Sequence, residues 1–281
     1  MLSVPHTFCS QLGQALSIRT DLIPEAYALE LRALQDAVPP FETSKARDIL
    51  QREFGVNDLS KIFAELTEEP VASASVGQVY KGILAKDGIT EVAVKVQRPG
   101  ILAEIALDLY ILRLLTPIQT RLQNFFNGVA TEQEDIDLAV ALVDEWGRGF
   151  VAETDYRLEA ENTIDFEAAM RKRRLDAVCA PTVVPELVRD NVLVTEWVQG
   201  TRLDLDASPD VPRLCGVAIN AYLTMLLDTG GKSRRHSVDL TCWIPFFSQI
   251  VLLCRQFFIV THTKATFFEP QMESCAFWTG V

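Results

Sequence analysis

The fold is decided by two neighbouring stretches, Pro70-Val71-Ala72-Ser73-Ala74-Ser75-Val76-Gly77-Gln78-Val79-Tyr80-Lys81-Gly82 and Glu91-Val92-Ala93-Val94-Lys95-Val96-Gln97. Both are short and rich in β-branched residues, which favour strands. Between them, Lys86-Asp87-Gly88 is a turn signal. The two stretches therefore predict a small antiparallel sheet.

Within these stretches, small residues fill the turn from Ala72 to Gly77, so its backbone N–H groups can approach a phosphate closely. Lys95 is the only charge in its apolar run, and on a strand it shares a face with Ala93. A lysine placed there either reaches solvent at a sheet edge or binds an anion. Together, the turn and the lysine match the kinase layout of phosphate loop, strand and V-A-x-K lysine.

Outward from the sheet, hydrophobic periodicity predicts helices, with Thr43 or Ser44 as the cap of one and Gly55 as its end. Their expected ranges are 11–20 continuing through 31, 45–54, 57–66, 101–126, 132–174 and 211–227. Two more strands are expected at 183–184 and 192–196. This order indicates an α+β fold.

Composition excludes several classes of protein. Of the 281 residues, 48% are hydrophobic, which is enough for a core and excludes a wholly disordered chain. The formal net charge of −12 disfavours general binding of nucleic acid. The six cysteines form no C-x-x-C pair, and no histidine lies between Ser10 and Gly230. A structural zinc site and histidine-based nucleophilic catalysis are therefore not expected in that region.

Kinases hold the strand lysine with a glutamate on a helix. The 132–174 pattern offers several acidic candidates, each of which is also typical of a solvated helix face: Glu145, Glu153, Asp155, Glu159 and Glu161. The run 192–200 is an apolar strand that enters a polar link. It suits either an ordinary core strand or a hinge whose backbone hydrogen-bonds an adenine.

Three motifs of the chain resemble the UbiB family of atypical protein-kinase-like proteins, which is linked to ubiquinone and other prenyl-quinone lipids. They are Ala72-Ser73-Ala74-Ser75-Val76-Gly77-Gln78-Val79-Tyr80, Val92-Ala93-Val94-Lys95-Val96-Gln97-Arg98-Pro99-Gly100 and Glu153-Thr154-Asp155-Tyr156-Arg157-Leu158-Glu159-Ala160-Glu161-Asn162. A fourth, Leu12-Gly13-Gln14-Ala15-Leu16-Ser17, resembles the end of the family's Lys-x-Gly-Gln helix. The resemblance covers roughly residues 11–230, and the spelling of 17–24 is similar to plastid and cyanobacterial members.

The resemblance implies a role for each matching residue. Lys95 would bind the α- and β-phosphates of ATP, which the family binds as Mg-ATP, and Glu159 would hold Lys95 in place. Glu153 and Asp155 would form a Glu-x-Asp motif that meets the helix of Gln14 over the active site. An alanine-rich loop over the phosphates would be formed by Ala72, Ser73, Ala74, Ser75, Val76 and Gly77. Two flanking nucleotide contacts would come from Val79 and Ala93. The adenine hinge would be formed by Thr195, Glu196, Trp197 and Val198. In the family the extra helix occludes the protein-substrate groove, which implies ATPase-like or small-molecule chemistry rather than ordinary protein phosphorylation.

The chain departs from the family pattern in three ways. Gln11 replaces the lysine of Lys-x-Gly-Gln, and both chain ends look unrelated to the family. The family's His-x-Asp-Pro-His-Pro-Gly-Asn and Asp-Phe-Gly segments do not occur in the chain. Because Mg²⁺ and a carboxylate support phosphoryl transfer, we expect weak nucleotide binding, no metal site and no turnover.

The resemblance implies a protein-kinase-like N-lobe with an N-terminal helical extension and an incomplete, mainly helical C-lobe. The expected domains are the extension at 1–66, the N-lobe and hinge at 67–200, the start of a truncated C-lobe at 201–230 and an unrelated tail at 231–281. The resemblance implies a plastid or a mitochondrion, although no targeting peptide is visible. Quinone-pathway proteins or a lipid membrane surface are the expected partners besides the nucleotide.

Two other classes of function stay open. One is a non-catalytic regulatory protein that engages a full-length relative or a quinone-pathway assembly. The other is a membrane-associated interaction protein anchored through the apolar stretch 243–260. Arg255 and other polar residues interrupt that stretch, which disfavours a membrane span.

Overall fold

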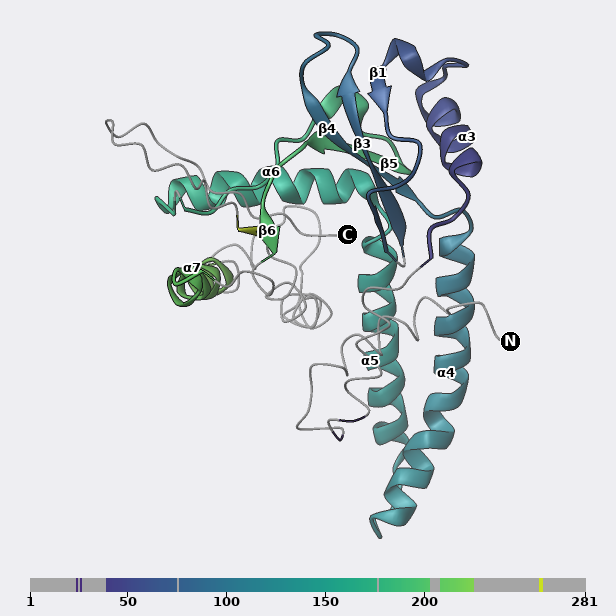
Figure 1. The fold of residues 1–281 in the computed structure, drawn as a ribbon. Coiled ribbons are helices and arrows are strands. Elements are labelled where there is room, and N and C mark those ends of the chain that lie inside the picture. The colour runs from purple at the N-terminus through teal and green to yellow at the C-terminus, as the bar shows by residue number, and fades with distance from the viewer. Residues whose placement is uncertain are drawn as a thin grey trace.

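An antiparallel sheet forms around the two stretches quoted first. The computed structural model describes residues 24, 26, 39–74, 76–175, 177–202, 208–224 and 258–259. In it, β3 (Gly77–Leu84) pairs with β4 (Glu91–Gln97). The five strands are completed by β1 (Phe63–Leu66) and β2 (Ala72–Ser73), which both pair with β3, and by β5 (Val192–Glu196), which pairs with β4 (Figure 1). The predicted antiparallel sheet is confirmed.

Helix α3 (Thr43–Phe54) covers one face of this sheet. Its Ala46 and Leu50 pack with alternate strand residues, among them Val94 and Val194, in a buried core. The helix ends at Gly55, which has a φ of 65°, as its sequence predicted. The predicted cap at Thr43 or Ser44 is wrong, because both residues lie inside the helix and Glu42 precedes it without a side-chain cap bond.

The predicted helix at 57–66 is also wrong. A short 3₁₀ turn, η1 (Leu59–Lys61), begins after Asp58, whose side chain accepts a hydrogen bond from the Ser60 N–H. The chain then extends into β1, because this brings Phe63 into the core beside Phe54 and lets β1 pair with the edge of β3. Both α3 and β1, assigned to the N-terminal extension from sequence, share the core of the sheet.

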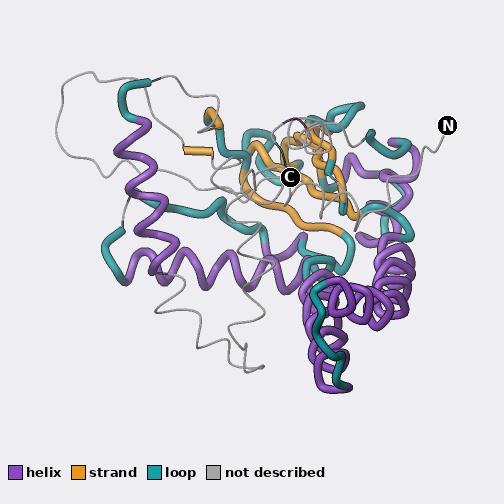
Figure 2. Tube along the Cα trace, turned by 90° about the horizontal axis from the view of Figure 1, so that it is seen from below, coloured by secondary structure: helices purple, strands orange, loops and turns teal. Residues whose placement is uncertain are grey.

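Two long helices, α4 (Ile101–Phe126) and α5 (Gln133–Ala152), lie side by side and project from the sheet as a hairpin (Figure 1). The predicted helix at 101–126 is confirmed. Gly147 permits close packing of the two helices, because a Cβ there would lie 2.9 Å from the Leu109 side chain. Figure 2, seen from below, shows the helices of the hairpin nearly end-on, at one side of the strands.

The predicted single helix at 132–174 is wrong, since the chain breaks after α5 and restarts as α6 (Tyr156–Lys172). Asp155 causes the restart, because its carboxylate accepts hydrogen bonds from the N–H groups of Arg157 and Leu158 as the N-cap of α6. The break turns α6 across the second face of the sheet, where Tyr156 and Ala160 pack with Leu193 and Val183.

The remaining elements follow α6. The predicted strand at 183–184 is wrong, since Val183 forms only an isolated bridge with Thr195, before the 3₁₀ turn η2 (Pro185–Leu187). Helix α7 (Val211–Thr224) packs its Leu214 and Ala218 against Met170 of α6. A small second sheet pairs β6 (Thr201–Arg202) with β7 (Phe258–Ile259). The molecule has the expected α+β fold.

Several expectations lie outside the described residues. These are nearly all of the expected helices over 11–31, including Gln14, the end of the helix expected at 211–227, and nearly all of the stretch 243–260. Within the part of the chain that the structure describes, no helix combines the length and apolar character needed to cross a membrane.

Candidate nucleotide-binding site

Lys95 and Glu159 meet between the sheet and α6. Lys95 lies on β4, and its Nζ donates to both carboxylate oxygens of Glu159 at 2.8 and 2.9 Å. As the strand pattern predicted, Lys95 shares its face with Ala93, while Val94 and Val96 face α3. The break before α6 sets this contact, because Glu159 lies on the first turn after the Asp155 cap.

A small cavity adjoins the ion pair, with a volume of about 20 Å³. This is near the volume that a single water molecule needs, so a nucleotide base enters only if side chains move apart. The lining comes from β4, α6, β5 and the segment before β5, namely Ala93, Lys95, Glu159, Thr163, Pro181, Leu193 and Thr195. Ala93 and Thr195 are two of the positions assigned to nucleotide contacts from sequence.

The small-residue turn joins β2 to β3. Its Ala74 N–H donates to the carbonyl of Gly77, which closes the turn. Arg98 follows β4 and binds the outer side of the turn: its N–H donates to the Val76 carbonyl and its guanidinium to the Ala74 carbonyl. These two hydrogen bonds from Arg98 to the Val76 and Ala74 carbonyls hold the turn in place. Ser75, at its tip, lies outside the described residues.

Tyr156 lies beneath the turn. Its ring packs 4.9 Å from Lys95 Nζ, measured to the ring centroid, in a cation–π contact. Its hydroxyl is 2.5 Å from the place where a Cβ on Gly77 would lie. The side chain is fully buried, and among the described residues this hydroxyl has no hydrogen-bond partner. Burial raises the pKa of Tyr156 well above its usual range, and the charge of Glu159 adds to this, so the phenol is neutral.

The segment assigned to the hinge begins in β5 and leaves the sheet. The Glu196 N–H donates to the Thr182 carbonyl, and the Trp197 N–H donates to the Glu91 carbonyl. Both donors are therefore used within the protein. The N–H of Val198 makes no backbone hydrogen bond to the described residues.

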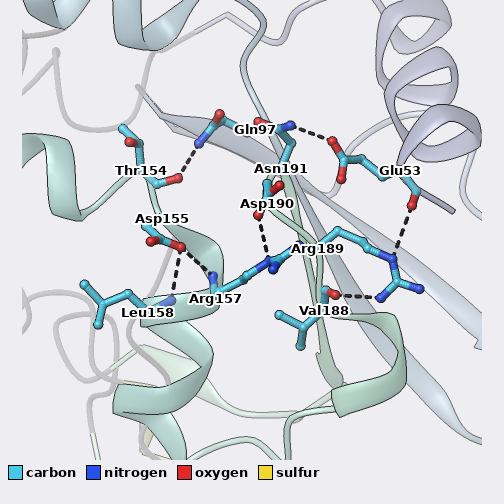
Figure 3. Close-up of polar contacts among 10 residues, drawn as sticks. All are labelled: Glu53, Gln97, Thr154, Asp155, Arg157, Leu158, Val188, Arg189, Asp190 and Asn191. Carbon is cyan, nitrogen blue, oxygen red and sulfur yellow. Dashed lines mark hydrogen bonds and ion pairs between the residues drawn. The ribbon is translucent and has the colours of Figure 1, made fainter. Parts of the chain in front are cut away.

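Glu153 and Asp155 lie in the short link between α5 and α6. Gln97, at the end of β4, donates from its buried side chain to the Thr154 carbonyl at 2.6 Å and so ties this link to the sheet (Figure 3). The Asp155 carboxylate is the cap of α6, and Gln14, its expected neighbour, is outside the described residues.

A second set of polar contacts anchors the start of α6 and of β5. Arg157 pairs with Asp190 at 2.7 Å, on the loop that precedes β5 (Figure 3). On the same loop, Arg189 donates to the Glu53 carbonyl of α3, and Asn191 to the Glu53 carboxylate. These bonds tie the start of α6 to the loop before β5, and that loop to α3.

Three residues of the site had no role in the sequence analysis: Gln97, Arg98 and Tyr156. Gln97 and Arg98 directly follow the strand that carries Lys95, and Tyr156 follows the capping Asp155. Their positions inside the quoted motifs were the available signal, since a polar group next to a catalytic-type lysine often supports it. Among the described residues, no group of three or more His, Cys, Asp or Glu side chains forms a metal site.

The antiparallel sheet, the small-residue turn and the strand lysine paired with a helix glutamate define a protein-kinase-like fold. The chain belongs to the family of the ABC1 atypical kinase-like domain, whose model it matches over residues 33–231, more than half of its length. This family, also named UbiB or aarF, is the one that the sequence motifs indicated.

Relatives in a plant and a cyanobacterium are similar over most of the chain. A chloroplastic aarF domain-containing protein kinase of Arabidopsis thaliana is 40% identical over 69% of this chain and 26% of its own length. Protein ACTIVITY OF BC1 COMPLEX KINASE 1, chloroplastic, of the same plant, is 37% identical over 76% of this chain and 29% of its own. A Synechocystis protein is 37% identical over 78% of this chain and 31% of its own.

The chain thus spans between 26% and 31% of the length of these relatives. A Mycobacterium tuberculosis protein, Rv3197, solved in complex with erythromycin, is 31% identical over 73% of this chain and 49% of its own, with a TM-score of 0.47.

Proposed function

We propose that this chain is the nucleotide-binding lobe of a UbiB-type atypical kinase, and that ATP binds between the turn at 72–77, Lys95 and the hinge. The observation that carries the proposal is the ion pair of Lys95 with Glu159, because it holds an ammonium in place over the Tyr156 ring, whose hydroxyl lies next to Gly77 at the end of the small-residue turn. In kinases the same pair positions the lysine for the α- and β-phosphates.

The groups on this side of the sheet fit a nucleotide. Lys95 supplies a positive charge whose side chain is only 18% exposed, so its attraction for phosphate is less screened than at the open surface. Ala93 and Leu193 line an apolar wall suited to a base, and the Val198 N–H is free of the described residues to donate to it. Gly77 keeps the turn close to the site, since a side chain there would collide with Tyr156.

Phosphoryl transfer needs more than these groups. In the family, Mg²⁺ neutralises the phosphates, and its asparagine and aspartate ligands belong to motifs that the 281 residues do not contain. Within this chain Lys95, the backbone of the turn and neutral donors meet the phosphate charge. We therefore infer weak nucleotide binding and no turnover by this chain.

The biological setting follows from the relatives. The Arabidopsis relatives are named as chloroplastic, which supports a plastid for this protein, whereas the mitochondrial alternative has no such support. A link to prenyl-quinone lipid metabolism and to quinone-pathway proteins is inferred from the family resemblance alone.

The test is nucleotide binding by the purified chain. Saturation-transfer NMR with ATP, ADP and adenosine, with and without Mg²⁺, measures weak binding directly. We expect Lys95→Met to abolish detectable ATP binding, and Lys45→Met, which removes a surface lysine paired with Glu42, to leave it intact. ATP binding that is equal in the two variants would overturn the proposal. Magnesium-dependent ATP hydrolysis above the Lys95→Met control would overturn the inference of no turnover.

A second candidate is a non-catalytic interaction protein that binds a lipid surface. It is favoured by the apolar exposure of the α4–α5 hairpin, where the Phe125 and Phe126 side chains at the end of α4 are 76% and 80% exposed. Flotation with phosphatidylcholine vesicles tests it. If the hairpin binds lipid, Phe125→Ser/Phe126→Ser reduces flotation, and equal flotation of both proteins contradicts this candidate.

A further inference from the structure

The hydroxyl of Tyr156 is a buried donor that has no acceptor in the part of the chain that the structure describes. Tyr156 is 0% exposed, and its oxygen makes no hydrogen bond to any described residue. A buried polar group left unpaired costs about 1–3 kcal/mol, so such groups are uncommon in folded proteins. The cost is avoidable here, because phenylalanine would fill the same space without the hydroxyl.

The surroundings of this hydroxyl all belong to the proposed phosphate site. On one side lies Gly77, the end of the small-residue turn, and an added Cβ there would be 2.5 Å from the hydroxyl and 2.6 Å from the Val96 carbonyl. The Lys95 ammonium lies over the tyrosine ring, and Glu159, one turn along α6, holds that ammonium. The hydroxyl therefore points from the strand lysine toward the underside of the turn.

The chemistry of this position selects the ligand. The phenol is neutral and protonated, since burial and the Glu159 carboxylate both disfavour the phenolate. It can donate one hydrogen bond, and a phosphate oxygen is a strong acceptor that Lys95 also attracts. A carboxylate of the protein is a poorer candidate, because Glu159 already accepts from Lys95 through both oxygens.

We propose that the Tyr156 hydroxyl is a phosphate-binding group that donates a hydrogen bond to a phosphate oxygen of the nucleotide under the 72–77 turn, beside Lys95. This inference rests on the proposed nucleotide binding and adds a specific ligand contact to it. Because Gly77 covers the hydroxyl in the ligand-free chain, binding requires the turn to move off the ring. The environment of Tyr156 therefore changes when phosphate arrives.

The experiment compares Tyr156→Phe with a matched control, Tyr80→Phe. Both tyrosines are buried in the same lobe, but the Tyr80 hydroxyl is satisfied, by the Gln78 side chain and Thr43. Affinities for ATP, ADP and adenosine are measured by saturation-transfer NMR. We expect Tyr156→Phe to bind ATP and ADP about tenfold more weakly, as for a lost hydrogen bond to a charged group, and to bind adenosine unchanged. We expect Tyr80→Phe to bind all three as the wild type does.

Two further measurements exclude a merely structural role. The ligand-free melting temperature should stay the same or rise in Tyr156→Phe, because no hydrogen bond is lost, and should fall in Tyr80→Phe. In the wild type labelled with ¹³Cζ-tyrosine, ADP should shift the Tyr156 signal, assigned by its absence in Tyr156→Phe, and adenosine should not.

Each outcome decides one proposal. If the wild type binds no nucleotide, the proposed function fails. If the wild type binds ADP while the Tyr156 signal stays still and Tyr156→Phe binds equally well, this inference fails and the proposed function stands. Equal weakening of adenosine and ADP binding in Tyr156→Phe would mean a structural role and would also overturn the inference.

Discussion

The Lys95 ammonium donates to both carboxylate oxygens of Glu159, at 2.8 and 2.9 Å, across 64 residues of chain. Between the two residues the chain forms the whole α4–α5 hairpin before it returns to the sheet as α6. The contact therefore depends on the anchored start of α6, and the predictions below test the groups that build it.

Glu159→Gln should weaken ATP binding several-fold without unfolding the chain. The partly exposed pair contributes about 1 kcal/mol or less to stability, so the main loss is the positioning of Lys95. The control is Glu161→Gln, an exposed carboxylate on the same helix. Titration of both variants with ATP, followed by NMR, measures the effect, and equal affinities would contradict the prediction.

Gly77→Ala should destabilise the chain by roughly 1–3 kcal/mol, as overpacking of a tight contact does. The new methyl group would meet the Tyr156 hydroxyl and the Val96 carbonyl at 2.5 and 2.6 Å. Urea unfolding measures this loss. Adding Tyr156→Phe should recover part of it, because one of the two collisions disappears.

Gly216→Ala is the control. A Cβ at Gly216 would meet no atom within 4 Å, so the substitution should stabilise the chain by up to about 1 kcal/mol through α7. A neutral Gly77→Ala would show that the turn adapts freely.

Arg98→Met should weaken nucleotide binding, because the Ala74 carbonyl loses the guanidinium donor that would hold the turn against the phosphates once the turn has moved off the Tyr156 ring. Arg189→Met is the matched control. Like Arg98, Arg189 donates to backbone carbonyls and lies over a phenylalanine ring, but it does so away from the turn, against α3. Isothermal titration with ATP compares the two. A larger loss of affinity in Arg189→Met would be incompatible with the role given to Arg98.

Asp155→Ala should cost about 1 kcal/mol of stability, the usual loss when an N-cap is removed. Asp155→Ser keeps a capping oxygen and should retain most of the stability. Thermal unfolding followed by circular dichroism gives both values. If Ser and Ala are equally damaging, the carboxylate acts through its charge and not as a cap of α6.

The pH dependence of stability should include a contribution from Asp87, in the turn between β3 and β4. Hydrogen bonds from the Thr90 hydroxyl and from the Ile89 and Thr90 N–H groups lower the pKa of Asp87 to about 2. Because its pKa is lowered by folding, Asp87 stabilises the folded state at pH values above its unfolded pKa of about 4, and this stabilisation is lost as the pH falls toward 2.

Urea unfolding between pH 6 and 2.5 should show that Asp87→Asn loses less stability on acidification than the wild type does. Parallel curves would contradict the assignment, and carboxyl ¹³C NMR reads the pKa directly.

Much of the lobe could be predicted because its signals are local. The alternation of Val92, Val94 and Val96 fixes which face of β4 packs against α3, and this places Lys95 on the opposite face with Ala93. Gly55 ended α3 as expected, because only a left-handed conformation closes the helix there. The family motifs lie in these same local segments.

Other features were missed because they depend on contacts between distant segments. Residues 57–66 have a helical pattern, yet pairing with β3 and burial of Phe63 favour a strand. The run 132–174 is periodic throughout, but Asp155 caps a new helix once Gln97 fixes the Thr154 carbonyl. From sequence, Tyr156 is indistinguishable from an ordinary aromatic residue of the core. Only the structure shows that its buried hydroxyl lies next to Gly77.

From the order of its residues alone, this chain specifies an α+β kinase-like lobe with a lysine facing away from the valine core, because strand alternation and helix ends are encoded within a few neighbouring residues. Which carboxylate meets that lysine, and which hydroxyl lies beneath the turn, depends on the packing of α6 against the sheet. Such contacts join residues many positions apart, and their geometry exists only when the whole lobe has folded.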